Sequence, residues 1–245
     1  MVEPKTFLKA SLDAGRELLR PLASADDAPE TDAPRQTLAL VPIRSIGPSE
    51  RDRVVTHLLA LDDRDRYLRF GYAATDEHIR RYVTGLDFDR DEVFGIYNRN
   101  LELIAMAHLA FSVDPQCASC AEFGVSVLGK ARGRGYGGHL FDRAAMHARN
   151  QGVTMIFIHA LTENTAMLKI ARNAGASVER DGSESEAYLM LPAATLDTRM
   201  SEMVEHQFAE ADYTLKAQAQ RFRNFLAGLQ EVRAGVREAR HRSRG

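Results

Sequence analysis

Residues 125–138 constrain the fold of this chain more than any other segment. Residues 125–128, Val-Ser-Val-Leu, have the composition of a strand end, and four glycines in six residues follow between Gly133 and Gly138. Behind them an amphipathic pattern begins, with small and apolar residues at helical spacing. Its members are Leu140, Phe141, Ala144, Ala145 and Ala148. The segment therefore predicts a strand and a helix joined by a glycine-rich turn, which is a unit of α/β proteins.

The same segment has the chemistry of an anion site. Glycine lets the backbone approach a ligand closely and adopt positive φ. The first turn of the following helix offers unpaired N–H groups and the positive end of the helix dipole. Arg132 and Arg134 add two cations that a simple turn does not need. These features predict a phosphate or pyrophosphate site.

The glycine spacing alone does not select a nucleotide. Gly133, Gly135 and Gly138 match the spacing G-x-G-x-x-G of dinucleotide-binding folds. Such a fold needs an acidic residue about 20 positions further on, at the end of the next strand. That strand ends here at His159-Ala160, and the phosphate-loop pattern G-x-x-x-x-G-K-[ST] is absent. A dinucleotide-dependent enzyme therefore remains only an alternative.

Apolar periodicity places this segment inside a larger domain. From residue 37 the pattern reads strand, two helices, three strands, helix, strand, helix and two short strands. We expect an α/β (α+β) fold with a mixed central sheet flanked by helices. The expected strands cover 38–43, 92–97, 101–111, 122–128, 155–159, 178 and 187–191, and the expected helices begin near residues 49, 75, 135 and 164.

Two blocks of sequence resemble the GNAT superfamily of N-acetyltransferases. Arg132, Gly135 and Gly137 fit the pattern R/Q-x-x-G-x-G/A of that family's acetyl-CoA pyrophosphate loop. One helix and one strand later, the stretch from Asn164 to Gly175 is similar to the family's helix after its fifth strand. The resemblance covers about residues 38–192. It implies an enzyme that moves an acetyl group from its co-substrate acetyl-CoA to an amine by direct attack, and it implies no metal.

The resemblance also gives roles to matched positions. Backbone groups of Val125 and Val127 would pair with the pantetheine arm, and the N–H of Val127 or Leu128 would polarise the acetyl carbonyl. Asn164 would contact acetyl-CoA near the pantetheine. The pyrophosphate would be held by the segment from the motif arginine to the last glycine, which consists of Arg132, Gly133, Arg134, Gly135, Tyr136, Gly137 and Gly138.

One departure from the family pattern points to a subset. Many members have a Tyr that can protonate the leaving thiolate, but Ala171 stands at that position. The same helix, together with Arg66–Gly71 and Ala121–Phe123, resembles bacterial protein lysine acetyltransferases of the Pat type. In these enzymes a Glu ten residues before the loop Q/R is the proposed general base, and Glu122 has that spacing from Arg132.

A base in a half-buried strand would have a raised pKa, which suits proton abstraction from an amine. We therefore expect Glu122 to be catalytic, with a protein lysine as the favoured acceptor. A solvated charge at a strand edge is the other interpretation of Glu122. His108 and His159 are alternative bases. A small-molecule amine acetyltransferase, or a non-catalytic acyl-CoA-binding regulatory module, would also fit the sequence.

Composition excludes several other classes. The 245 residues carry 32 Lys+Arg against 34 Asp+Glu, so no global charge favours nucleic acid. No run approaches the about 18 apolar residues of a membrane span. The only two cysteines, Cys117 and Cys120, cannot frame a secreted scaffold or supply four zinc ligands, and we expect them to be two ordinary loop cysteines. A cytoplasmic location is the expectation.

Three regions follow from these patterns. Residues 1–36 form an N-terminal extension with an acidic, Pro-containing linker, residues 37–192 the acetyltransferase domain, and residues 193–245 a helical extension with a basic tail. In this extension Phe208, Leu215 and Phe222 recur every seven residues, as in a coiled coil. From residue 216 onward eight Lys/Arg face two Glu, so this part carries +6 and the rest of the chain −8. A homodimer through this helix or docking on the chain's own domain is expected, whereas nucleic acid or membrane contact is less favoured.

Overall fold

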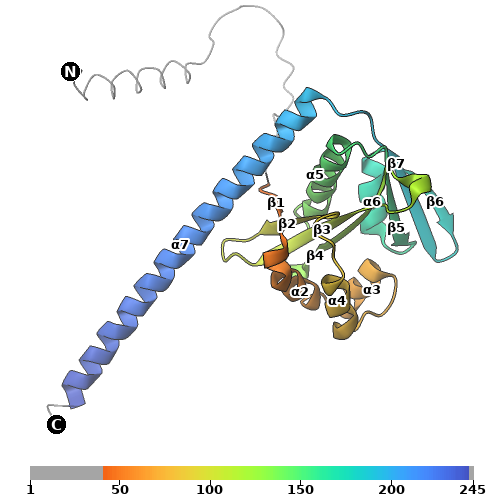
Figure 1. Ribbon diagram of the computed structural model, residues 1–245. Coiled ribbons are helices and arrows are strands. Elements are labelled where there is room, and N and C mark those ends of the chain that lie inside the picture. Colours follow the sequence, from red (N-terminus) through yellow and green to blue (C-terminus); the bar gives the residue numbers. More distant parts are fainter. Residues whose placement is uncertain (1–40, 243–245) are drawn as a thin grey trace, which may run out of the picture. The chain divides into compact units, whose positions relative to one another are not determined.

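The structure, a computed structural model, describes residues 41–242, with side chains placed up to residue 227 of the last helix. Seven strands form one mixed sheet in the order β1-β2-β3-β4-β5-β7-β6 (Figure 1). Among these described strands only the β4–β5 pair is parallel. The strands are β1 Arg44–Ser45, β2 Glu92–Tyr97, β3 Leu103–Phe111, β4 Cys120–Val127, β5 Met155–Leu161, β6 Ser177–Asp181 and β7 Glu184–Met190.

Six α-helices accompany the sheet in the described part of the chain. They are α2 Arg51–Leu59, α3 Asp63–Phe70, α4 Asp76–Thr84, α5 Tyr136–Asn150, α6 Thr165–Asn173 and α7 Leu196–Arg242, and single 3-10 turns lie at Pro48–Glu50, Pro115–Cys117 and Gly129–Ala131. The predicted α/β architecture with a mixed sheet and a long C-terminal helix is confirmed. The N-terminal extension and the start of the predicted strand 38–43 lie outside the described residues. Residues 41–43 form no strand, and pairing with β2 begins only at Arg44.

The helical region before β2 holds three helices rather than the predicted two. Asp62 caps α3 by accepting a hydrogen bond from the Asp65 N–H (2.8 Å), and Gly71 ends it in the left-handed conformation at φ 78°. Thr75 and His78 form a capping box at the start of α4. The cap residues Asp62 and Gly71 were the sequence signal for the missed helix.

The two faces of β4 meet different surroundings because side chains alternate along a strand. Phe123, Val125 and Val127 pack into the larger core, which is shared with α5 and α6. Glu122, Gly124 and Ser126 face the other side, the side that α2, α3 and α4 cover (Figure 1). This second face becomes important at the site, because Gly124 leaves room there for a side chain from another element.

Strands β4 and β5 pair only at one end. Cys120, Ala121 and Glu122 lie opposite Met155, Ile156 and Phe157, and beyond Glu122 the two strands form no further pairs. β5 continues along β7 instead. The edge of β4 that faces β5 is therefore unpaired from Phe123 onward, and this opening lies directly before the glycine loop.

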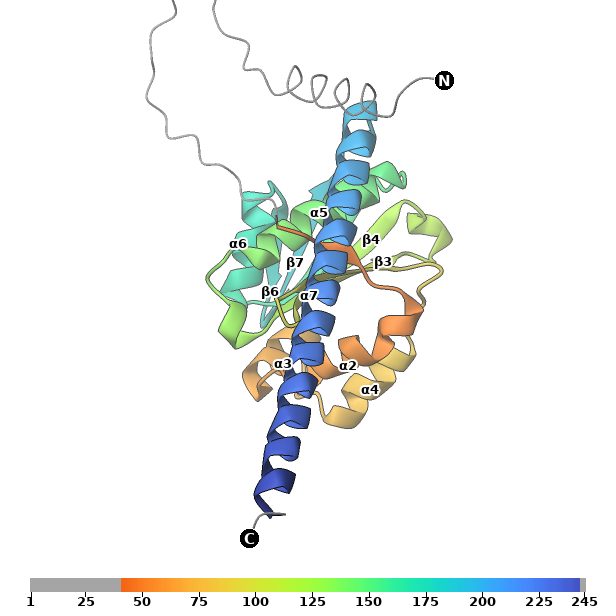
Figure 2. The ribbon, with the colours of Figure 1, turned by 90° about the vertical axis from the view of Figure 1, so that its left-hand side faces the viewer.

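Helix α7 is 47 residues long, and its first half lies on the domain (Figure 2). Glu202 accepts hydrogen bonds from Arg143, His147 and Asn150 of α5 at 2.6–2.9 Å. Further along, Arg44 bonds to Glu210, and Lys216 donates to the Tyr97 carbonyl. No helix within residues 41–242 is both long enough and apolar enough to cross a membrane.

Candidate active site

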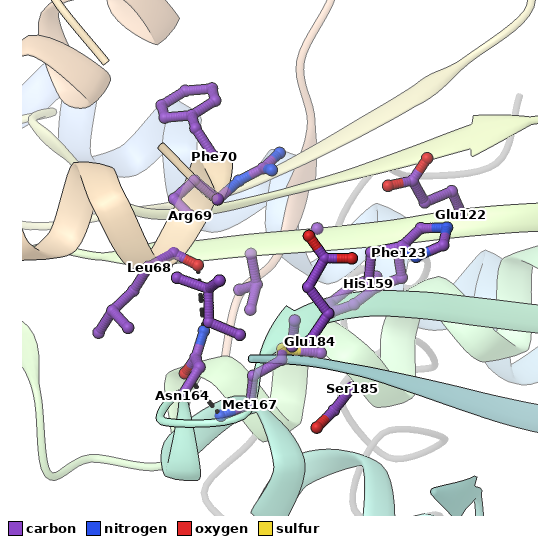
Figure 3. Close-up of a pocket in the computed structure, with 15 residues that line it drawn as sticks. Leu68, Arg69, Phe70, Glu122, Phe123, His159, Asn164, Met167, Glu184 and Ser185 are labelled. Atoms are coloured by element: carbon purple, nitrogen blue, oxygen red, sulfur yellow. Dashed lines mark hydrogen bonds between the residues drawn. The ribbon is translucent and has the colours of Figure 1, made fainter. Parts of the chain in front are cut away.

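Two pockets meet at the open edge of β4. The first, which we call the groove, runs along residues 125–138 and the exposed side of α6. The second, which we call the mouth, is bounded by α3, β4, β5 and β7 (Figure 3). We call the place where they meet the junction, because five residues line both pockets. These residues are Leu68, Arg69, Val125, Asn164 and Met167.

The glycines of the groove have separate structural reasons. Gly133 (φ 76°) and Gly135 (φ 74°) adopt the left-handed conformation that other residues avoid. A Cβ on Gly137 would lie 2.9 Å from Ile170 Cδ1, so this glycine lets α5 and α6 approach each other. A Cβ on Gly138 would meet nothing within 4 Å. No steric contact within the described residues therefore requires a glycine at position 138.

The first turn of α5 is left free for a ligand. Gly135 is its N-cap residue and makes no side-chain cap, so the N–H groups of Tyr136, Gly137 and Gly138 have no intrahelical acceptor. Arg132 lines the groove and forms an ion pair with Asp65 of α3 across it. Arg134 is exposed and does not line the groove.

The register of the sheet decides which β4 amides face the opening. The Leu128 N–H donates to the Ile104 carbonyl of β3 at 3.0 Å. In an antiparallel pair only alternate residues bond to the neighbouring strand, so Val125 and Val127 direct their N–H and C=O groups toward β5. β5 has already separated there. Of the two amides considered for the acetyl carbonyl, that of Leu128 is therefore unavailable and that of Val127 is open.

Asn164 is placed at the junction, but its amide is already engaged. Its Oδ1 accepts the Met167 N–H at 3.1 Å and caps α6, while its Nδ2 donates to the Leu68 carbonyl at 3.2 Å. The residue thus ties the end of α3 to the start of α6. The structural role of Asn164 is therefore to fix the width of the junction.

Arg69 is the residue whose importance the sequence did not show. Its guanidinium occupies the space above Gly124, where an added Cβ would lie 2.6 Å from Cζ. Among the described residues no carboxylate lies within ion-pair distance of it. Its one side-chain hydrogen bond there runs from Nη2 to the Tyr82 hydroxyl at 3.0 Å. In the sequence Arg69 stood out only as part of the stretch Arg66–Gly71.

A chain of hydrogen bonds holds Tyr82 in place. Its hydroxyl lies 2.8 Å from His108 Nδ1, and His108 Nε2 lies 3.1 Å from the carboxylate of Asp91. Because that carboxylate only accepts, Nε2 donates to it and Nδ1 accepts the Tyr82 hydroxyl. Burial lowers the pKa of His108 and raises that of Tyr82, so both are neutral at pH 7. Arg69 therefore forms no ion pair among the described residues, and its hydrogen-bond partner Tyr82 is neutral.

A second buried histidine accounts for Ser126. His57 Nδ1 donates to the Leu103 carbonyl at 2.9 Å, which leaves Nε2 to accept the Ser126 hydroxyl at 2.8 Å. Burial lowers the pKa of His57 to about 4, so the ring is neutral. This pair fixes β4 against α2 beside the junction.

The mouth carries the titratable groups that face the solvent. Glu122, His159 and Glu184 line it (Figure 3). The Nδ1 atom of His159 lies 3.3 Å from the carboxylate of Glu186. Glu122 is exposed rather than half-buried, so the desolvation expected from its strand position is not found. His108, the other histidine considered as a base, lines neither pocket.

Two positions at the edge of the site complete the description. Ala171 is fully buried in the core, so α6 brings no hydroxyl to the junction at that position. Cys117 and Cys120 form a disulfide immediately before Glu122, instead of remaining two ordinary loop cysteines.

Comparison with known proteins agrees with this geometry. Residues 56–176 match the model of the Acetyltransferase (GNAT) family. The GNAT domain of S. lividans PAT is similar, with 23% identity, a TM-score of 0.52, and coverage of 61% of this chain and 89% of that one. The acetyltransferase of GNAT family from Streptococcus pneumoniae is also similar, with 13% identity, a TM-score of 0.50, and coverage of 61% and 98%. No curated protein matches the sequence.

The domain that contains residues 56–176 belongs to the GNAT family of acetyltransferases. It is an acetyl-CoA-dependent N-acetyltransferase, so its co-substrate is acetyl-CoA and its acceptor is an amine.

Proposed function

We propose that this chain is a cytoplasmic protein-lysine acetyltransferase of the Pat type. The observation that carries the proposal is the acidic mouth, where Glu122 and Glu184 line the approach to the junction and Glu186 stands beside His159. A lysine side chain is a flexible cation with a pKa near 10.4, so carboxylates attract it before it reacts. The exposure of Glu122 and His159 also lets a side chain reach in from another protein's surface.

In this proposal the groove holds acetyl-CoA. The free N–H groups of Tyr136, Gly137 and Gly138 would bind the pyrophosphate at the start of α5. The open backbone of Val125 and Val127 would pair with the pantetheine arm as an added strand would. The acetyl carbonyl would then lie at the junction, within reach of the Val127 N–H.

The chemistry needs one base and two sites for negative charge. Glu122 accepts the proton of the lysine ammonium, directly or through water, and the freed amine forms a bond to the acetyl carbon. The Val127 N–H stabilises the charge that develops on the carbonyl oxygen. As the carbon–sulfur bond breaks, the electron pair stays on sulfur, and the nitrogen of the new amide gives its remaining extra proton to water. The charge of Arg69, which forms no ion pair among the described residues, lies at the junction to stabilise the thiolate. This assignment needs no acid at the position of Ala171.

A thiol-release assay tests the proposal. Acetyl-CoA is offered with lysine peptides flanked by basic residues, lysine peptides flanked by acidic residues, and small amines. We expect turnover to be highest with the basic-flanked peptide. A preference for a small amine would show that the acceptor is a small molecule rather than a protein lysine. Tight acetyl-CoA binding without turnover on any acceptor would favour the regulatory binding module.

A further inference from the structure

The face of α7 that points away from the domain is apolar and exposed. Ala209 marks the face that packs on the domain, since it is only 2% exposed. At 100° per residue, Val204, Phe208, Leu215 and Phe222 stand about 100–140° away from it around the helix. Their exposed fractions are 63%, 42%, 66% and 61%. Docking on the domain therefore leaves these side chains uncovered.

These exposed residues have the spacing of a coiled coil. Positions 204, 208, 211, 215, 218, 222 and 225 alternate steps of four and three, which is the a/d pattern. We call this set the seam. The sequence continues the same steps through Leu229, Val232 and Val236, with Gln218 as the one polar member. The a/d side chains of such a seam pack against those of another helix with the same heptad pattern. A second copy of this chain provides such a helix.

Charge distinguishes the two ways in which such helices can pair. Residues 216–242 hold seven Lys/Arg against two Glu, whereas residues 196–215 hold five acids against one Arg. A parallel pair would place two basic halves side by side. An antiparallel pair would place each basic half along the acidic half of the other copy. Some of these acids also bind their own domain, as Glu202 and Glu210 do, so the preference rests on the net charge of each half.

Packing also favours the antiparallel pair of helices. Among the α7 residues whose side chains are described, contacts with the domain extend as far as Arg223, which donates to the Arg99 carbonyl at 3.2 Å. A long helix gains most of its stability from tertiary packing. In an antiparallel pair the second half of each helix would lie against a half that its own domain already fixes.

We propose that two copies of this chain associate through an antiparallel coiled coil of their α7 seams. The register that uses the whole seam pairs position 204 with 236 and centres the twofold axis near residue 220. The acidic mouth is formed by other elements and stays open in each copy.

The mass of the full chain in solution tests the association. Light scattering after gel filtration should give twice the 27.3 kDa of one chain. Phe222→Asp should give the monomer mass because it places a charge in the seam. Asn224→Asp, the same new charge at an exposed position off the seam, should leave the dimer intact, and acetyl-CoA binding should persist in both variants. A monomeric wild type overturns the proposal, and so does a dimeric Phe222→Asp variant.

Spin-label distances test the orientation. In a Cys117→Ser/Cys120→Ser chain labelled at Gln207→Cys, the two labels should be about 40 Å apart, from 1.5 Å per residue on each side of residue 220. A label at Ala219→Cys, also an exposed position, should give a short distance in the same dimer. Parallel helices would bring the Gln207 labels to about 10 Å, the usual helix separation, and would overturn the antiparallel proposal.

Discussion

The groove and the mouth are neighbours, but they are built in different ways. The groove is made mostly of backbone, with free amides at the start of α5 and along the open edge of β4. The mouth is made of side chains from α3, β4, β5 and β7, which are far apart in sequence. A backbone site needs glycine at fixed spacing, and glycine spacing is visible in a sequence. A site made of distant side chains has no comparable local pattern.

The largest effect that separates the two regions is expected at Glu122. Glu122→Gln keeps the size of the side chain but removes the base, so kcat should fall about 10²-fold or more. The dissociation constant for acetyl-CoA should not change. Glu163→Gln is the matched control, because Glu163 is exposed and lines neither pocket. Steady-state kinetics and acetyl-CoA titration provide the two readouts, and an unchanged kcat would remove Glu122 from the mechanism.

The next effect is expected at the junction. Arg69→Met removes the positive charge at the junction, and kcat should fall roughly 10- to 10²-fold because one electrostatic contact to the developing charge is lost. Arg80→Met, at an exposed position of α4, is its control. Gly124→Val should lower kcat in the same direction, since its side chain would occupy the place of the guanidinium. Normal turnover in Arg69→Met would contradict the assigned role.

Gly138→Ala tests the groove alone. The added Cβ meets nothing in the protein, and alanine favours a helix over glycine by up to about 1 kcal/mol. The melting temperature should therefore stay or rise, while the dissociation constant for acetyl-CoA rises about tenfold, or 1.4 kcal/mol. Gly129→Ala is also uncrowded and lies outside the groove, so it should leave the affinity unchanged. Undiminished affinity in Gly138→Ala would show that the ligand does not approach this turn.

A smaller effect is expected at the rim of the mouth. The double variant Glu184→Gln/Glu186→Gln should raise KM for a basic-flanked lysine peptide about threefold, since exposed charge pairs each contribute up to about 1 kcal/mol. KM for acetyl-CoA should remain constant. The increase should shrink in high salt, because salt screens exposed charges. Equal changes for basic and acidic peptides would argue against charge recognition of the acceptor.

The smallest effect on activity is expected far from both pockets, at Glu202. Burial alone would raise the pKa of Glu202, but hydrogen bonds from His147, Asn150 and Arg143 lower it to about 2. A lowered carboxyl pKa stabilises the fold above the unfolded value near 4.5, and this contribution is lost as pH falls toward 2.

Denaturant unfolding should therefore show that Glu202→Gln loses stability at pH 7 and has a flatter dependence between pH 5 and 2. Glu205→Gln is the control, because burial raises the pKa of Glu205 and gives the opposite sign. Both variants should keep their kcat and acetyl-CoA affinity under folded conditions. A change in kcat would show that α7 is coupled to the site.

The sequence predicted the parts of the site that depend on local patterns. The strand, the glycine loop and the start of α5 are adjacent in the chain, so spacing identified them. Glu122 was predicted from the resemblance to Pat-type enzymes, but its exposure depends on how β4 and β5 separate. The engagement of Asn164 with Leu68, a residue 96 positions away, had no local signal.

By itself the sequence determined the α/β class, the anion loop and the heptad period of the last helix, because each arises from residues close together in the chain. Only the tertiary structure decided that Arg69 lies over Gly124 and that a neutral chain through Tyr82 and His108 holds it. It also decided that α7 docks by the face opposite its seam. The physical reason is that such contacts join elements distant in sequence, and packing rather than periodicity selects which side chains meet.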